Sequence, residues 1–375
     1  MDLSELRAKL DTIDKQLLAL FRERMETVVG VAEYKKREGL PLYQPDREQQ
    51  ILDRVGAEAG DLGGYARVLF STLMSLSRSY QAKLSGAGEA LERALDAAVS
   101  IEDFPLGGNV ACQGVEGAFS QEACLKLMPE ANILYFKNFD AVFSAVESGL
   151  CEYGVLPAEN STHGTVSRVY DLMLEHRFSI VRSTKLKVSH SLLALPGSKL
   201  SGIKEVISHE QAIGQCRKYL DSLGVKSRAV ENTALAAKEV AESGRTDIAA
   251  LSSLRCAELY GLQVLAEDVQ DESHNFTRFI CIAPEMKTYP GANKLSFMCS
   301  LPHIPGALNS LISRIAVLGL NLTKLESRPI PGRDFEFTFY FDIEADPADP
   351  EVRALIGELE TMTESFRFLG AYSEV

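Results

Sequence analysis

The apolar positions of the first 40 residues recur at alternating spacings of three and four. This spacing is typical of a helix with one apolar seam, and it holds for Leu3, Leu6, Leu10, Ile13, Leu17 and Leu20. The pattern continues to Val31, and Gly39 followed by Pro41 predicts its end. Such a helix is ~50 Å long at 1.5 Å per residue. Because this is too long for a small monomeric domain, we expect the helix to pack against a second copy of the chain.

Two more helices complete the first segment of the chain. One begins near Pro45 and turns Ile51, Leu52 and Val55 inward, and the next covers about residues 65–84. Residues 85–108 are rich in alanine and glycine, which indicates a partly helical linker. We therefore predict an all-α domain over residues 1–84 and a linker over 85–108.

The pattern changes after the linker, where short apolar runs alternate with helical ones. The runs predicted as strands are Ile133–Phe136, Tyr153–Leu156, Ile203–Ile207, Ile248–Leu251 and the segment NFTRFICIAP that begins at Asn275. This alternation favours an α/β domain over residues 109–284. Its length suggests two lobes with a cleft between them.

A third pattern covers residues 293–375. Phe335, Phe337, Phe339, Phe341 and Ile343 alternate with other residues, which predicts a strand with one buried face. Other strands are expected at KLSFMCSL, Leu320–Ser327 and about 366–373, with helices at Ala307–Leu318 and near 349–361. The order is βαββαβ, the ferredoxin-like plan of an α+β domain.

Composition and charge narrow the possible functions. The net charge of −13 argues against a nucleic-acid partner, and no apolar run is long enough to cross a membrane. The amino-terminal residues lack the apolar core of a signal peptide. The seven cysteines are scattered without a CxxC pair, and the six histidines form no HxxxH pair. We expect a cytoplasmic protein without a metal site.

Charged and polar residues gather where the helical domain should be apolar. Residues 1–85 carry 13 basic and 13 acidic side chains and are neutral, although the whole chain is acidic. One polar residue on a seam can simply fix the helix register. Here, however, several side chains face the same interior, namely Arg24, Lys35, Arg47, Glu48, Ser77 and Gln81, with Arg7 beside the seam. Because unpaired buried charges are costly, a bound dianion would explain this group.

These helices resemble the all-helical class of chorismate mutase. The resemblance lies in LRAKLDTIDKQLLALFRERMETVVGVAEYKK, PDREQQIL and SLSRSYQ. It implies a domain-swapped homodimer in which each site takes Arg7 from one chain and its other residues from the second chain. Arg7, Arg24 and Arg47 would hold the two carboxylates of chorismate with help from Ser77, Glu48 would take the ring hydroxyl, and Lys35 and Gln81 would donate to the ether oxygen. Gln44 stands in the substrate-binding loop where the family often has an aspartate.

Polar loops follow three strands of the α/β domain. They are QGVEGAFS at 113–120, AENSTHGTV at 158–166 and ISHEQAIGQC at 207–216, and each alone could be an ordinary turn or helix cap. Together with Thr277 and Arg278 inside a buried strand, they indicate a ligand site at the strand ends.

This set of loops resembles prephenate dehydratase, a two-lobe fold like that of periplasmic binding proteins, of which NFTRF is a hallmark. The resemblance implies that Thr277 serves the leaving hydroxyl as acid or relay, and that no cofactor is needed. It assigns substrate contacts to Glu159, Asn160, Ser208 and Gln215. Arg278 is either a carboxylate partner or a structural strut, and the sequence leaves this open.

The last domain carries two short signatures. Gly306–Ala307–Leu308 and Glu326–Ser327–Arg328–Pro329 resemble the phenylalanine site of the ACT domain that follows prephenate dehydratases. A glycine lets a ligand approach the backbone, and the start of a helix favours its carboxylate. Asn309 stands where an apolar residue is common. The resemblance implies that L-phenylalanine binds between subunits and inhibits the dehydratase.

The whole chain is thus similar to bifunctional enzymes of phenylalanine biosynthesis that convert chorismate to prephenate and then to phenylpyruvate. We expect a homodimer and leave a tetramer open. One alternative is an amino-acid-responsive ligand-binding protein without catalysis, in which the charges of the helical domain have no role. A mutase fused to a dehydrogenase would need a GxGxxG after a strand, and the sequence has none.

Overall fold

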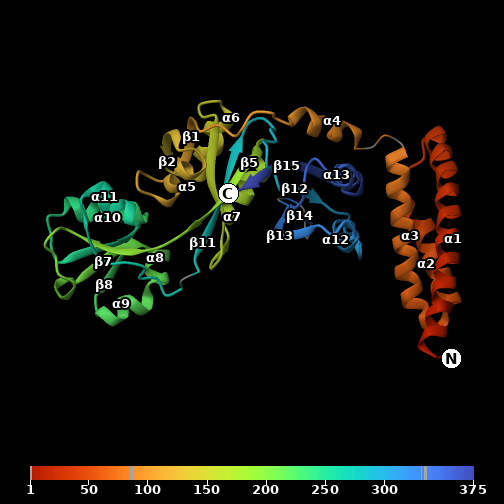
Figure 1. The fold of residues 1–375 in the computed structure, drawn as a ribbon, viewed down its shortest axis with the longest axis horizontal. Helices are drawn as coiled ribbons and strands as arrows, with labels where there is room; N and C mark the ends of the chain where they lie inside the picture. The colour runs from red at the N-terminus through yellow and green to blue at the C-terminus, as the bar shows by residue number, and fades with distance from the viewer. Residues whose placement is uncertain (1, 85, 87, 273, 331, 333–335) are drawn as a thin grey trace. The chain divides into compact units, whose positions relative to one another are not determined.

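The computed structural model describes residues 2–84, 86, 88–272, 274–330, 332 and 336–375 (Figure 1). The chain divides into two compact units. The first contains Met1–Ala97 and Met298–Arg367, and the second contains Ala98–Phe297 and Phe368–Val375. Each unit is therefore built from segments that are distant in the sequence.

Three helices form the amino-terminal part of the first unit. They are α1 (Leu3–Glu38), α2 (Pro45–Glu58) and α3 (Gly63–Leu84), and a 3₁₀ turn at Gly60–Leu62 precedes α3. Asp2 and Glu5 form a capping box at the start of α1, and Gly39 ends the helix in the left-handed region. The predicted helices are thus confirmed. The seam leucines of α1 from Leu3 to Leu20 are exposed in the single chain, by 43–62%.

The predicted βαββαβ order is also observed. It consists of β12 (Lys294–Ser300), α12 (Ala307–Val317), β13 (Asn321–Pro329), β14 (Phe337–Glu344), α13 (Pro350–Met362) and β15 (Ser365–Glu374). The strands are ordered β13-β14-β12-β15, so β13 lies at an edge. The expected linker contains helix α4 (Glu89–Ala98). The start of β12 and the end of β15 belong to the second unit, and the rest of both strands belongs to the first.

Strand β14 differs from the prediction that only one of its faces is buried. Tyr340 and Asp342, on the face opposite the phenylalanines, are fully buried, whereas Phe337 at the strand start is exposed. The period-two pattern placed the residues between the phenylalanines, including Tyr340, on the solvent side. A tyrosine, however, is a large apolar ring with one polar atom, so it can be buried. Phe335 lies outside the described residues.

The first lobe of the second unit contains a mixed sheet. Its strands are β1 (Gly107–Gln113), β2 (Glu130–Phe136), β3 (Tyr153–Asn160), β5 (Ser179–Lys187) and β11 (Phe276–Ala283), ordered β15-β5-β11-β3-β1-β2, with β4 (Gly164–Thr165) beside β3. The helices of this lobe are α5 (Phe119–Leu127), α6 (Phe139–Glu147) and α7 (Ser167–Glu175). Strand β11, which carries Thr277 and Arg278, lies between β3 and β5.

The second lobe forms from the chain between β5 and β11. Its sheet is ordered β10-β6-β9-β7-β8, with β6 (Ser191–Ala194), β7 (Glu205–His209), β8 (Lys226–Val230), β9 (Ile248–Ser252) and β10 (Gln263–Ala266). Its helices are α8 (Glu210–Gln215), α9 (Arg217–Leu223), α10 (Thr233–Glu242) and α11 (Leu254–Tyr260), with a 3₁₀ turn at Leu200–Gly202. The two-lobe α/β prediction is therefore confirmed.

Among the described residues, we find no helix that combines the length and apolar character needed to cross a bilayer.

Candidate active sites

Arg24 connects α1 to α3 in the helical domain. Its guanidinium donates to the carbonyl oxygen of Leu73 at 3.1 Å and to the hydroxyl of Ser77, which itself donates to Leu73 at 2.7 Å. Burial lowers the pKa of Arg24. Two residues predicted for one substrate, Arg24 and Ser77, are thus in direct contact.

Lys35 lies at the other end of α1 and is 9% exposed. Its ammonium group donates to the carbonyl oxygen of Leu42 at 2.7 Å, which ties it to the loop before α2. Burial lowers the pKa of Lys35, the carboxylate of Glu48 raises it, and the guanidinium of Arg78 lowers it. The lysine therefore shares its surroundings with two residues of α2 and α3.

Arg78 is a residue that we did not predict for this site. It forms an ion pair with Glu48, and its guanidinium lies 5.1 Å from the ring centre of Tyr43. It stands three residues before the buried Gln81, which is the spacing of one helix face, so the signal was present in SLSRSYQ. Glu48 therefore faces a cation of its own chain.

Three predicted mutase residues are not brought into this cluster. Arg7 and Arg47 are exposed, and Gln44 precedes α2 without a side-chain capping bond. Arg7 and Lys35 lie on one continuous helix, where their separation in sequence corresponds to ~42 Å at 1.5 Å per residue. Arg7 and Lys35 of one chain therefore cannot contact one small substrate.

Thr277 faces Asn160 across the β11–β3 pair of the second unit. The side-chain amide of Asn160 donates to the Thr277 hydroxyl at 2.9 Å and to Asn275 Oδ1 at 2.7 Å. Asn160 Oδ1 in turn accepts the backbone N–H groups of Thr162 and His163 at 3.0 Å each. Because the threonine oxygen accepts from Asn160, its own O–H proton is able to donate elsewhere.

The chain of contacts continues into the second lobe through two histidines that we did not predict. Gln215 Nε2 lies 3.2 Å from Nδ1 of His163, and Gln215 Oε1 lies 2.8 Å from Nε2 of His190. Burial lowers the pKa of His190, whereas its hydrogen bond to Gln215 raises it. Because the amide oxygen only accepts, Nε2 of His190 carries the proton. His163 belongs to the quoted AENSTHGTV loop, but nothing in the sequence signals the role of His190.

Ser208 has a different environment from the other predicted contacts. It is fully buried, and its hydroxyl donates to the carbonyl oxygen of Leu251 at 2.7 Å. Its role as a substrate contact stays a prediction.

Arg278 and Glu159 form a pair of their own. Arg278 Nη1 donates to Glu159 Oε1 at 3.1 Å, and the arginine is 3% exposed. Adjacent residues of a strand point to opposite faces, so this pair lies on the other face of the sheet from Thr277 and Asn160. Arg278 also contacts Tyr372 and Glu374 of β15. The geometry favours the strut that the sequence left open.

The QGVEGAFS loop forms a packed turn. The Gly117 N–H donates to Gln121 Oε1 at 2.7 Å, and Gly117 has φ +90. A Cβ at this position would lie 2.7 Å from the sulfur of Cys256, so only glycine fits. Because this amide already has a partner on α5, the structure favours the turn over an anion site at Gly117.

The two signatures of the last domain lie on α12 and β13. Gly306 precedes α12 in the left-handed region with φ +85 and is exposed. Glu326, Ser327 and Arg328 lie on β13, where Lys324 is 3.7 Å from Glu326. An edge strand next to an exposed helix start is open to a second chain.

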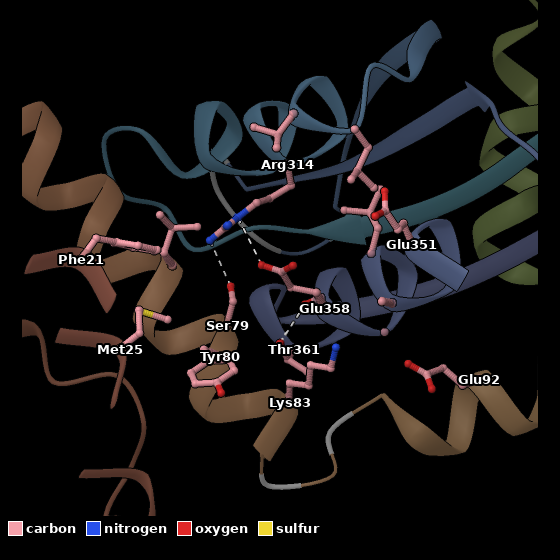
Figure 2. Close-up of a pocket in the computed structure, with 16 residues that line it drawn as sticks. Phe21, Met25, Ser79, Tyr80, Lys83, Glu92, Arg314, Glu351, Glu358 and Thr361 are labelled. Carbon is pink, nitrogen blue, oxygen red and sulfur yellow. Dashed lines mark hydrogen bonds and ion pairs between the residues drawn. The ribbon is translucent and has the colours of Figure 1, made fainter. Parts of the chain in front are cut away.

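A cavity of about 400 Å³ lies within the first unit, where α1 and α3 face α12 and α13. Figure 2 shows Arg314 extending toward Ser79 and Glu358. Its guanidinium donates to Ser79 at 3.1 Å and lies 3.2 Å from Glu358. None of the residues that line the cavity belongs to the predicted mutase or phenylalanine sites. Arg314 thus contacts the helix that also carries Ser77 and Gln81.

The helical cluster and the two-lobe domain define a protein with two separate catalytic domains. Family models match each of them: chorismate mutase type II matches residues 6–82, and prephenate dehydratase matches residues 110–287. Arogenate dehydratase/prephenate dehydratase 1 of Arabidopsis thaliana is 39% identical over 279 residues, which cover 70% of this chain and 71% of the relative. The chain belongs to the prephenate dehydratase family.

Two solved structures are similar to this chain. Prephenate dehydratase from Arthrobacter aurescens, in complex with L-Phe, is 28% identical with a TM-score of 0.65, covering 71% of this chain and 90% of that chain. A protein described as GqqA, a novel type of quorum quenching acylase, is 33% identical with a TM-score of 0.65, covering 71% and 98%. The chain has a chorismate mutase and a prephenate dehydratase domain and therefore belongs to phenylalanine biosynthesis.

Proposed function

We propose that this protein converts chorismate to prephenate at a mutase site containing Lys35 and Gln81, and prephenate to phenylpyruvate at a site containing Thr277. The observation that carries the second site is the chain of polar contacts from Thr277 through Asn160 and His163 to Gln215, which joins both lobes. The bounds 1–84, 109–284 and 293–375 remain our proposal for the three domains.

The mutase chemistry needs orientation and hydrogen-bond donors, without proton transfer. The rearrangement requires a compact substrate and donors aimed at the negative charge that grows on the ether oxygen. Lys35 and Gln81 would supply these donors, Arg24, Arg47 and Ser77 would hold carboxylates, Glu48 would take the ring hydroxyl and Gln44 would border the site. Arg7 would come from a second chain, because its own site is ~42 Å away along α1.

The dehydratase chemistry needs a proton donor for the hydroxyl that leaves. Prephenate loses carbon dioxide and the ring hydroxyl, and the electrons of the broken carbon–carbon bond complete the aromatic ring. Thr277 would deliver a proton to the leaving oxygen, so that water departs. Asn160, Ser208 and Gln215 would bind the substrate, whereas Glu159 pairs with Arg278 on the other face of the sheet and would act only through that pair.

The carboxy-terminal domain would act as an ACT domain that binds L-phenylalanine. Its site would contain Gly306, Ala307, Leu308, Glu326, Ser327 and Arg328. Support comes from the exposed helix start at Gly306 and from the related Arthrobacter enzyme, whose structure holds L-Phe. We infer a homodimer, since the seam of α1 and the edge strand β13 are both open to a second chain.

Arogenate is a second candidate substrate of the dehydratase, because the Arabidopsis relative is named for both arogenate and prephenate. The two candidates predict different products, phenylpyruvate from prephenate and phenylalanine from arogenate.

Incubation of the purified protein with chorismate, followed by product analysis, tests the proposal. We expect prephenate first and phenylpyruvate later, and a higher kcat/KM for prephenate than for arogenate. Accumulation of prephenate without phenylpyruvate would contradict the dehydratase assignment, and a reversed preference would establish arogenate as the substrate.

A further inference from the structure

The last strand of the chain reaches the strand that carries Thr277. Strand β15 pairs in parallel with β5 at Ser373–Arg182 and Glu374–Ser183, and β5 is also the neighbour of β11. Gly370 makes this approach possible, because a Cβ at this position would lie 2.1 Å from the carbonyl oxygen of Ile180. The end of the carboxy-terminal βαββαβ segment is therefore built into the dehydratase sheet.

Two side chains of β15 reach Arg278 from the same face of that strand. Arg278 Nη2 donates to the Tyr372 hydroxyl at 3.1 Å, and Arg278 Nε lies 3.6 Å from Glu374 Oε2. Tyr372 and Glu374 are two residues apart, which places them on one face. The tyrosine hydroxyl also lies 2.7 Å from Ser296 Oγ on β12. The guanidinium thus has partners on β15 as well as Glu159 on β3.

The centre of this group is buried, and its charges are paired. Tyr372 and Ser296 are fully buried, and the side chain of Glu374 is 12% exposed. Burial raises the pKa of Glu374, but the ammonium groups of Lys185 and Lys294 and the guanidinium of Arg278 outweigh it and hold the pKa below its usual range. Each buried charge needs its partners, so loss of one partner disturbs the others.

We propose that Tyr372 and Glu374 are positioning residues of the dehydratase. They fix the position of the Arg278 guanidinium. Through Arg278 they also fix the backbone of β11, which carries Thr277. Through the ion pair with Glu159 they fix the end of β3, which carries Asn160. The proposal rests on the assignment of Thr277 to the dehydratase site. It gives the end of the carboxy-terminal segment a part in catalysis in addition to any binding of phenylalanine.

The test compares the wild-type protein with Tyr372→Phe and Glu374→Gln, which keep the side-chain shape and remove one hydroxyl or one charge. Tyr289→Phe is the matched control, because Tyr289 is a buried tyrosine of the same unit whose hydroxyl lies 3.5 Å from that of Tyr153. We expect dehydratase kcat to fall on the order of tenfold in both test variants, since small displacements of catalytic groups have effects of this kind. KM for prephenate should change little, and the mutase rate of the same samples should stay that of wild type.

A merely structural role predicts a different result. In that case the melting temperature of Tyr372→Phe and Glu374→Gln would fall, but their dehydratase kcat per folded enzyme, measured below the unfolding transition, would equal that of Tyr289→Phe. An unchanged kcat in either of the two variants, provided that the variant folds, would overturn the proposal. Thr277→Ala is measured alongside. If Thr277→Ala retains the wild-type dehydratase rate, the assignment of the site fails, whereas inactive Thr277→Ala with unaffected Tyr372→Phe and Glu374→Gln refutes only the positioning role.

Discussion

Lys35 combines a catalytic assignment with a perturbed environment, because burial lowers its pKa from the ordinary value of 10.5. The ammonium form is the proposed donor to the ether oxygen. As pH rises, a lysine with a lowered pKa loses its proton earlier than an ordinary lysine. We therefore expect mutase kcat/KM to decline as the pH rises, and this decline should begin before pH 10.5. A pH series with chorismate as substrate measures it.

Lys35→Arg is the matched variant for the pH series, because arginine stays protonated up to about pH 12. Its mutase rate is expected to be lower at neutral pH, since the guanidinium has a different shape. Its alkaline decline should nevertheless move to higher pH than that of wild type. Superimposable declines in the two proteins would assign the titration to another group.

Thr277 is expected to be essential for the dehydratase alone. Thr277→Ala removes the proton donor and should lower dehydratase kcat on the order of 10²–10⁴-fold, while the mutase rate is retained. Thr277→Ser keeps a hydroxyl and should retain part of the activity. Thr288→Ala, at another buried threonine of the same unit, is the control for packing loss. Near-wild-type kcat in Thr277→Ala excludes this residue as the donor.

Helix α1 carries both Arg7 and Lys35 and exposes its leucine seam, so its length determines how the mutase site is assembled. We expect each of the variants Arg7→Ala and Lys35→Ala to be nearly inactive as a mutase. A mixture of the two should recover activity, because a hybrid dimer rebuilds one intact site from the unmutated halves. Differently tagged chains establish that subunits exchange; exchange without recovered activity rules out a shared site.

The two ends of α12 offer a matched pair for testing the phenylalanine site. Gly306 and Gly319 both have positive φ, and a Cβ at either meets no atom within 4 Å. A substitution therefore strains both backbones alike, but only Gly306 lies at the helix start, where the amides would receive the ligand. Gly306→Ala should weaken inhibition of the dehydratase by L-phenylalanine several-fold, within the 5–150-fold span of typical allosteric couplings.

Gly319→Ala should leave that inhibition unchanged. The measurement is dehydratase rate against phenylalanine concentration for wild type and both variants at one protein concentration. Identical curves for Gly306→Ala and wild type, or equal shifts in both variants, would remove Gly306 from the ligand site.

For the molecule as a whole, the carboxy-terminal segment cannot be deleted without touching the dehydratase. Residues 294–297 and 368–375 belong to the second unit, and they include the Arg278 partners Tyr372 and Glu374. Deletion of residues 286–375 should therefore abolish the response to phenylalanine and also lower the dehydratase rate without phenylalanine. A truncated enzyme with the full uninhibited rate would show that β15 serves regulation only.

The helices and strands followed largely from local patterns in the sequence. Helix α1 is an example, because its apolar seam, its capping residues and its terminal glycine each act over a few residues. Such local signals can be recognised from the sequence alone. The motifs likewise named Thr277, Asn160 and Lys35, because chemistry restricts the residue types that such sites use. Arg78 could also have been predicted as a residue of the mutase site, since it shares a helix face with Gln81.

The tertiary structure decided which of these residues meet. Arg278 and Tyr372 are 94 residues apart, and only the strand order β15-β5-β11-β3 brings them within a hydrogen bond. His163 of the first lobe and Gln215 of the second lobe are 52 residues apart, and only the fold of the two lobes brings their side chains into contact. Arg7 and Lys35 show the converse, since one continuous helix keeps them apart. Sequence patterns report neighbours within a few residues, whereas contacts between distant segments depend on sheet order and helix length.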